Sequence, residues 1–167
     1  MILYKQKPVN MKKNLLLLFA PLLILLSCSK KDSQTTDSTR QAVKDETAIK
    51  AYLAANTSIH ATRDPSGLYY QILKQGTGNN STATSLFTGN YAGKLLNDTT
   101  FTGGAFNKVL LSDLSLKGLI IGVPLIKAGG SILLIVPSAL GYGANPPSPN
   151  IPANSVVVFT IDLTALE

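Results

Sequence analysis

The sequence predicts an α+β domain of about 100 residues, in which roughly four or five antiparallel strands accompany one short helix. Short runs rich in Val, Ile, Leu, Phe and Tyr alternate with segments rich in Gly, Asn and Pro, a pattern typical of strands joined by turns. One apolar segment, residues 114–126, carries Gly118 and Gly122 four positions apart. Because these glycines thin one face, the segment suits a short helix that packs closely on a sheet.

The strands are expected at residues 67–74, 86–96, 131–136 and 155–163. The run 131–136 is apolar after its initial serine, which is typical of a strand covered on its inner face and partly elsewhere. Residues 79–85 read as a polar loop, and residues 101–104, which include two adjacent glycines, are expected to leave the sheet. Residues 137–154 contain five prolines and read as a long loop before the last strand.

The amino-terminal segment reads as a targeting signal. Residues 11–14 are a short basic start, residues 15–26 are almost entirely apolar, and Leu25-Leu26-Ser27-Cys28 follows. We expect a signal peptide over residues 1–27, in which 1–10 are a start-site overrun. The apolar run is too short for a spanning helix, which needs about 20 residues. The residues ending at Cys28 resemble the lipobox of bacterial lipoproteins, which implies lipidation of that cysteine; an ordinary signal peptide with an unrelated cysteine is the alternative.

A tether and a short helix are expected before the β-rich domain. Residues 28–41 comprise the cysteine and a polar stretch that reads as a flexible spacer. Residues 42–63 hold one short helix, ending near Asn56, and a connection in which His60 reads as a solvated loop residue. Asp45 or Ser38 is expected to cap the start of this helix. The domain itself is expected over residues 64–167.

Composition excludes several functions. The chain has a formal charge of +6, but cleavage before Cys28 removes four of the 15 basic residues and none of the nine acidic ones, which leaves +2. The small remaining positive charge therefore gives no support for a nucleic-acid partner, which needs clustered positive charge. One cysteine and one histidine cannot form an intramolecular disulfide or a structural zinc site. The sequence contains no phosphate-loop or dinucleotide motif, and neither a metal nor a cofactor is expected.

Several stretches of the chain from residue 66 onward form a set with a characteristic order and spacing. They are Asn90-Tyr91-Ala92-Gly93-Lys94-Leu95, Phe101, Leu116-Lys117-Gly118-Leu119, residues 136–143 (Val-Pro-Ser-Ala-Leu-Gly-Tyr-Gly), Ile151-Pro152-Ala153-Asn154-Ser155 and residues 159–163. In these stretches the chain resembles an FKBP-type peptidyl-prolyl cis-trans isomerase. The resemblance implies a twisted antiparallel sheet wrapped around one short helix, with the active site between helix and sheet. The upstream helix and lipobox are similar to those of lipoprotein members of the family.

The resemblance also implies the site residues. The catalytic positions carried over are Tyr91, Phe101, Tyr142 and Phe159, and the substrate-binding positions are Leu116, Leu119, Ile151 and Thr102. By analogy the Tyr142 hydroxyl and the Leu116 backbone N–H hold substrate carbonyls, while Leu119 forms the floor, where many members have Trp. From the residues alone, ordinary core packing remains an alternative for Phe101, Leu116, Leu119 and Phe159.

One departure from the family bears on activity. Members usually carry Asp directly after the phenylalanine at position 101, whereas this chain has Thr102. The expected function is isomerisation of Xaa-Pro bonds in exported proteins by a monomeric enzyme held by lipid to a bacterial membrane of the cell envelope. The alternatives are a membrane-tethered module that binds prolyl peptides, or acts as a chaperone, with weak or no catalysis, and a structural lipoprotein that uses the fold as a spacer.

Overall fold

The structure is a computed structural model that describes residues 30–82 and 84–167. The expected signal peptide, the start-site overrun and Cys28 lie outside the described residues. The chain divides into two units, residues 1–36 and residues 37–167, and the fold described below belongs to the second. Of the helices that the structure describes, none combines the length and the apolar character needed to cross a membrane.

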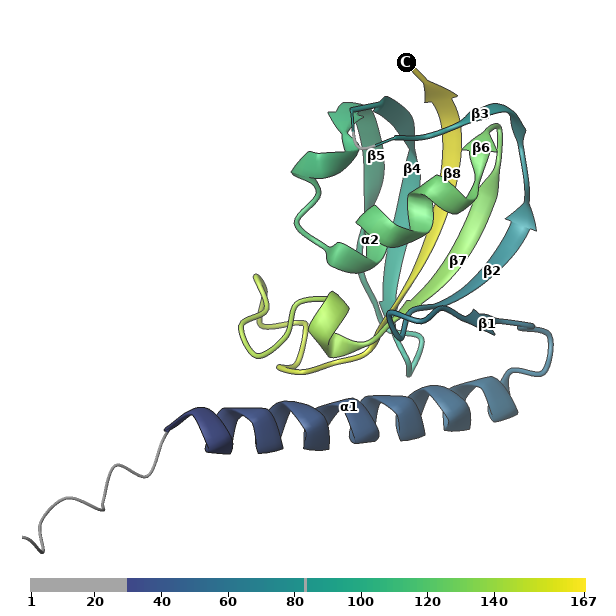
Figure 1. The fold of residues 1–167 in the computed structure, drawn as a ribbon. Coiled ribbons are helices and arrows are strands. Elements are labelled where there is room, and N and C mark those ends of the chain that lie inside the picture. Colours follow the sequence, from purple (N-terminus) through teal and green to yellow (C-terminus); the bar gives the residue numbers. More distant parts are fainter. Residues whose placement is uncertain (1–29, 83) are drawn as a thin grey trace, which may run out of the picture. The chain divides into compact units, whose positions relative to one another are not determined.

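A six-stranded antiparallel sheet dominates the second unit (Figure 1). Its strand order is β1-β2-β7-β8-β4-β5, and a separate pair joins β3 to β6. The strands are β1 (Thr62–Arg63), β2 (Tyr69–Lys74), β3 (Thr77–Asn80), β4 (Leu86–Leu95), β5 (Thr100–Leu110), β6 (Lys127–Ala128), β7 (Ser131–Val136) and β8 (Val157–Leu166). The helices are α1 (Lys30–Ala55) and α2 (Lys117–Gly122), with 3-10 turns η1 (Leu111–Asp113), η2 (Val123–Leu125) and η3 (Ser138–Leu140). The predicted α+β architecture is thereby confirmed.

The main core lies between α2 and one face of the sheet. Along β7, Ile132, Leu134 and Val136 point into this core, and along β8 so do Phe159 and Ile161. The alternation follows from the period of two in a strand, which sends successive side chains to opposite faces. The core therefore packs against the helix that carries Leu119 and that begins directly after Leu116, two of the predicted site residues.

The opposite side of the same strands is covered by α1. Ile49 and Tyr52 of the helix are buried against Ile135 of β7 and Val158 of β8. Both faces of β7 are thus covered, which goes beyond the partial cover expected for residues 131–136, and its sequence is apolar from Ile132 to Val136.

The glycine pair in α2 has the role that its spacing indicated. A Cβ atom on Gly118 would lie 2.5 Å from Cγ1 of Val136, and one on Gly122 would lie 2.6 Å from both Cδ atoms of Leu134. Real Cβ atoms do not approach other atoms so closely. The absence of side chains at these two positions therefore sets how closely the helix approaches β7.

The prediction for the start of the first helix was wrong. Residues 30–40, expected to form a flexible spacer, are helical, because α1 begins at Lys30 rather than near residue 42. Extending an existing helix costs much less than nucleating one, and an ion pair between Asp37 and Arg40 supports this polar stretch. Asp45, expected at the helix start, lies within the helix instead.

Residues 101–104, expected to leave the sheet, belong to the edge strand β5. They pair with β4, in the register Ala92↔Gly103 and Tyr91↔Gly104. Neither glycine forms a turn, and a Cβ on Gly104 would lie 3.3 Å from the Tyr91 hydroxyl oxygen, which is a tight contact. Part of the expected loop 79–85 is also strand, since β3 extends to Asn80.

Candidate active site

A cavity of about 450 Å³ opens beside α2. Its size falls within the range typical of sites for small molecules or single side chains. Its walls come from β4, β5, β8, the start of α2 and the proline-rich loop. The lining residues are Tyr91, Thr102, Phe106, Leu114, Ser115, Leu116, Leu119, Tyr142, Asn145, Pro147 and Phe159.

Three aromatic rings from separate elements pack together beside the cavity, and two of them, Tyr142 and Phe159, line it. The Phe101 ring meets the Tyr142 ring edge-on with centroids 6.0 Å apart, and meets the Phe159 ring in the same way at 5.8 Å. Aromatic pairs favour such edge-to-face contacts because the ring edge is positive and the face negative. Gly93 of β4 makes room for this cluster, since a Cβ there would lie 2.8 Å from Phe159 and 2.9 Å from Phe101.

A second pair of rings forms the wall on the β4–β5 side. The Tyr91 and Phe106 rings are stacked with centroids 4.4 Å apart and an interplanar angle of 26°. Phe106 in turn packs against the buried Phe87, with centroids 4.9 Å apart. The pairing of β4 with β5 therefore fixes the positions of Tyr91 and Phe106 on this side of the cavity.

Besides the polar side chains of Thr102, Ser115 and Asn145, two hydrogen-bond donors lie at the cavity. Leu116 precedes the first turn of α2, and its carbonyl accepts hydrogen bonds from the N–H groups of Leu119 and Ile120. Its own N–H has no hydrogen-bond partner among the residues that the structure describes. Because every backbone N–H is a hydrogen-bond donor, this group is available to a ligand carbonyl.

The Tyr142 hydroxyl is the second group. Burial raises the pKa of this hydroxyl above its ordinary value of 10.0, and the neighbouring Tyr91 raises that pKa further. The group therefore keeps its proton at neutral pH and can donate a hydrogen bond. Within residues 30–82 and 84–167 no partner for this hydroxyl is found.

The loop that carries Tyr142 has a defined backbone. Leu140 and Gly141 donate to the Pro137 carbonyl, and Gly143 donates to the Ser138 carbonyl over 3.0 Å. Gly143 has φ +58°, in the left-handed region that a glycine enters without strain. The glycine after Tyr142 thus lets the chain reverse where the tyrosine ring meets the Phe101 ring.

The structure brings most of the predicted site residues together. Those that line the cavity are Tyr91, Thr102, Leu116, Leu119, Tyr142 and Phe159. Phe101 stands behind the lining and contacts it through two other rings. Ile151 is buried, with 4% of its surface exposed, but does not line the cavity. The roles given to these residues remain predictions.

Sequence reasoning missed five lining residues. They are Phe106, Leu114, Ser115, Asn145 and Pro147. Phe106 was missed because residues 101–104 were expected to leave the sheet, which hid the continuous strand that connects Phe101 to Phe106. Asn145 and Pro147 lie in an irregular loop, where no periodic pattern indicates the direction of a side chain.

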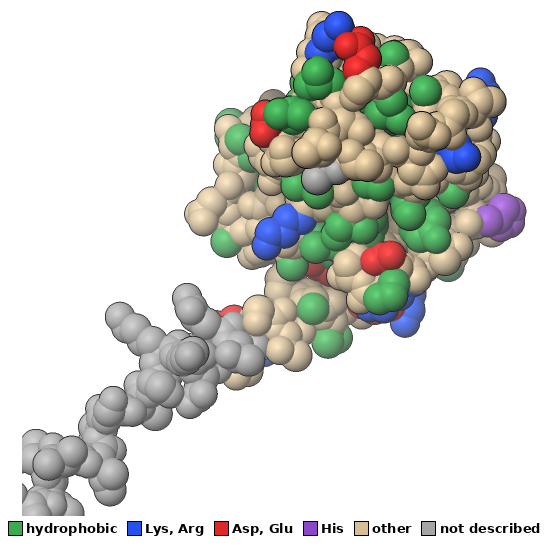
Figure 2. Space-filling model, turned by 45° about the horizontal axis from the view of Figure 1, so that its top comes forward, with side chains coloured by type: hydrophobic (Ala, Val, Ile, Leu, Met, Phe, Trp, Pro, Cys, Tyr) green, Lys and Arg blue, Asp and Glu red, His purple; other side chains and the backbone are tan. Residues whose placement is uncertain are grey.

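The electrostatics of the cavity are simple. Its lining contains no Asp, Glu, Lys, Arg or His side chain. Within the described part of the chain, no group of three or more His, Cys, Asp or Glu residues could hold a metal ion. On the face shown in Figure 2, basic and acidic side chains are scattered among polar and apolar ones. The cavity can thus enclose an apolar ring and donate hydrogen bonds, and it offers no acid–base pair.

Comparison with known proteins supports the resemblance seen in the sequence. The family model for FKBP-type peptidyl-prolyl cis-trans isomerases matches residues 78–164. The isomerase FkpA of Aeromonas hydrophila is 33% identical over 138 residues, which are 77% of this chain and 49% of that protein. A probable FKBP-type isomerase of Haemophilus influenzae is 28% identical over 83% of this chain and 57% of its own length.

A solved structure shares the fold. The crystal structure of FkpA from Escherichia coli matches with a TM-score of 0.63 and 26% identity, over 82% of this chain and 66% of the other. The chain spans about half the length of the curated relatives it matches. The predicted sheet wrapped around a short helix is confirmed, and the chain belongs to the family of FKBP-type peptidyl-prolyl cis-trans isomerases.

Proposed function

We propose that this chain accelerates the cis-trans rotation of Xaa-Pro bonds by holding the prolyl segment in the cavity beside α2. One observation carries the proposal: an apolar cavity lined by aromatic rings faces an N–H group and a hydroxyl that have no partner within the described residues. The family to which the chain belongs supports the same reading.

The reaction needs few chemical groups. Rotating a peptide bond costs about 18–20 kcal/mol, because the resonance of the amide must be broken. Xaa-Pro bonds populate both isomers and interconvert over tens to hundreds of seconds without a catalyst. No bond is made or cut, so the reaction requires neither a nucleophile nor an acid–base pair. A lining without charged side chains is compatible with this chemistry.

Desolvation is the proposed source of catalysis. Amide resonance separates charge, and water stabilises that planar form more than the twisted one. A prolyl ring enclosed by Tyr91 and Phe159 above Leu119 exchanges water for apolar walls, which lowers the barrier to rotation. The Leu116 N–H and the Tyr142 hydroxyl hold the flanking carbonyls, so that only the Xaa-Pro bond turns.

Phe101 has an indirect role in this proposal. Its ring contacts the rings of Tyr142 and Phe159, and it does not line the cavity. It therefore acts as a support that fixes two lining residues. Ile151 is buried within the proline-rich loop and does not line the cavity.

An isomerase assay tests the proposed activity. The chain from residue 29 onward is mixed with tetrapeptides that carry Phe, Leu or Ala before proline, and the rate of isomerisation is followed. We expect acceleration that is lost when Phe159 is replaced by Ala. A folded protein that gives no acceleration with any of the three peptides would refute the proposed isomerase activity.

The second candidate is a prolyl-peptide-binding or chaperone module. Thr102 favours it, because this residue lines the cavity where family members usually have a carboxylate. Binding of a prolyl peptide or of the family's macrolide inhibitors, measured by calorimetry without any turnover, would select this function over the first.

The proposal for location and partners rests on the sequence. The lipobox-like residues ending at Cys28 support a lipid anchor in a bacterial cell envelope, and proline-containing segments of exported proteins are then the substrates. Incorporation of radiolabelled lipid should be lost in Cys28→Ser, and unchanged incorporation would refute the anchor. The protein is proposed to act as a monomer, which sedimentation velocity tests directly.

A further inference from the structure

α1 contains a buried carboxylate outside the region matched by the family model. Asp45 has 3% of its surface exposed, whereas the match covers only residues 78–164. A buried charge is costly unless hydrogen bonds replace the lost water. The hydrogen-bond partners of this carboxylate therefore indicate its role.

Both oxygens of Asp45 are used. Oδ2 accepts hydrogen bonds from the Ser138 backbone N–H over 2.8 Å and from the Ser138 hydroxyl over 2.7 Å. Oδ1 accepts one from Nε2 of Gln41 over 2.7 Å. The same Nε2 atom of Gln41 lies 3.3 Å from the Asn154 carbonyl oxygen. One turn of α1 thus contacts two points of the proline-rich loop.

These two points bracket Tyr142. Ser138 lies four positions before the tyrosine, and its carbonyl accepts the Gly143 N–H over 3.0 Å. At the other end of the loop, Asn154 donates its N–H to the Gly143 carbonyl over 2.7 Å. Both contacts from α1 therefore converge on Gly143, the residue directly after Tyr142.

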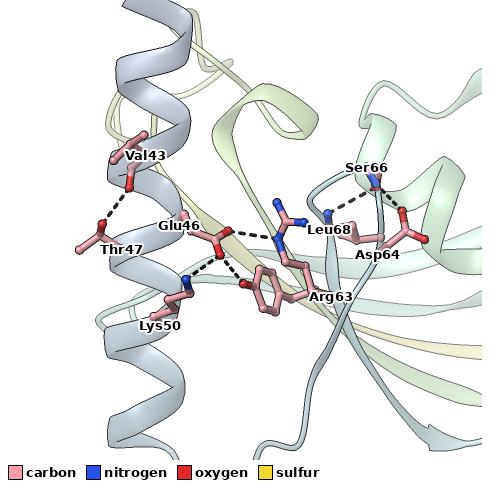
Figure 3. A network of polar contacts seen from close by, with 9 residues as sticks. Val43, Glu46, Thr47, Lys50, Arg63, Asp64, Ser66 and Leu68 are labelled. Atoms are coloured by element: carbon pink, nitrogen blue, oxygen red, sulfur yellow. Dashed lines mark hydrogen bonds and ion pairs between the residues drawn. The ribbon is translucent and has the colours of Figure 1, made fainter.

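The helix does not need Asp45 for its attachment to the sheet. Figure 3 shows Glu46 pointing from α1 towards Arg63, and its carboxylate also accepts the Tyr69 hydroxyl over 2.8 Å. Ile49 and Tyr52 add an apolar contact on the same helix. Glu46 therefore attaches the helix to β1 and β2, whereas Asp45 bonds to the loop through Ser138 and to Gln41 of its own helix.

We propose that Asp45 is a positioning residue for the active site. Through Ser138 it fixes the loop, and through the loop it fixes the Tyr142 hydroxyl relative to the Leu116 N–H. This inference rests on the proposed function and adds to it, because it makes a helix outside the family region part of the catalytic arrangement.

Kinetics of matched variants test the proposal. Asp45→Ala should lower kcat/KM about tenfold, which corresponds to about 1.4 kcal/mol, because the loop that carries Tyr142 loses its hydrogen bonds to α1. Glu46→Ala, the neighbouring acid on the same helix, should change kcat/KM by less than about twofold. Asp45→Asn keeps one acceptor for Ser138 and should recover part of the activity. Equal losses in Asp45→Ala and Glu46→Ala would overturn the proposal.

A double-mutant cycle separates positioning from general loss of stability. If Asp45 acts through Tyr142, Asp45→Ala should reduce kcat/KM by less than about twofold when Tyr142 is already Phe. If the fold-loss in kcat/KM of the double variant equals the product of the two single losses, the residues act independently, and the proposal is overturned. Should Asp45→Ala fail to fold, Asp45→Asn and Ser138→Ala replace it in the same cycle.

Hydrogen exchange gives a readout that needs no catalysis. The amides of Ser138 and Gly143 should exchange about tenfold faster in Asp45→Ala than in the wild type, and should be unchanged in Glu46→Ala. Unchanged exchange in Asp45→Ala would refute the role of Asp45. An inactive wild type with the expected exchange pattern would instead refute the proposed isomerase and leave the loop attachment in place.

Discussion

The close approach of α2 to β7 makes Gly118→Ala a sensitive test of the packing described above. The added methyl group would lie 2.5 Å from Cγ1 and 3.0 Å from Cγ2 of Val136. Val136 is fully buried, and it branches at Cβ, so its methyl groups cannot rotate away without leaving a preferred rotamer. The helix must therefore move away from the strand.

Two opposing effects set the magnitude. Forcing an extra methyl group into a packed core costs about 1–3 kcal/mol. Replacing glycine by alanine within a helix returns up to about 1 kcal/mol. We expect Gly118→Ala to lower the free energy of unfolding by about 1–2 kcal/mol. Because Leu116 and Leu119 move with the helix, kcat/KM should fall as well.

Urea denaturation measures the loss, and two comparisons identify its cause. Gly122→Ala should cost less, because its neighbours are the terminal methyl groups of Leu134 rather than those of a side chain branched at Cβ. Val136→Ala, combined with Gly118→Ala, should cost less than the sum of the single changes. A Gly118→Ala protein as stable as the wild type, or additive effects with Val136→Ala, would refute this reasoning.

Three further outcomes are expected. Phe101→Ala removes the ring that supports Tyr142 and should abolish most prolyl-peptide binding in calorimetry, whereas Tyr142→Phe should weaken it only modestly; equal small effects would contradict the arrangement. The hydrogen bond from Tyr69 holds the pKa of Glu46 below 4.5, so its stabilisation is present above that pH and is lost as the pH falls through the lower folded pKa. Glu46→Gln should flatten this acid loss of stability in urea titrations. Thr102→Asp returns the carboxylate usual in the family and should raise turnover, and unchanged turnover would show that this position does not limit the rate.

The sequence predicts best those elements whose burial is uniform. Residues 131–136 form β7 with the predicted bounds, because both faces of the strand are covered and the five positions after Ser131 are therefore apolar. The last strand was expected at residues 155–163 and runs from Val157 to Leu166. The helix with two glycines was found for a similar reason, since the spacing of the glycines follows directly from contact with one strand.

The role of a residue is predicted poorly when the residue that it contacts is distant in the sequence. Gly103 and Gly104 read as a turn because the Tyr91 ring that requires space at Gly104 belongs to another strand. Asp45 read as a helix cap because its partner, Ser138, lies 93 positions further along. Most of the site could be found through the family resemblance, whereas Phe106 and the loop residues depend on tertiary contacts that no local pattern records.

The place of β8 in the sheet has a consequence for how the chain folds. β8 is the last of the sheet's strands along the sequence, yet it pairs with β7 on one side and β4 on the other. During synthesis the earlier strands therefore emerge without the neighbour that joins them, and the sheet forms only after residues 157–166 are available. Such distant pairing predicts slow folding, and it predicts that shortening β8 divides the sheet in two instead of trimming its edge.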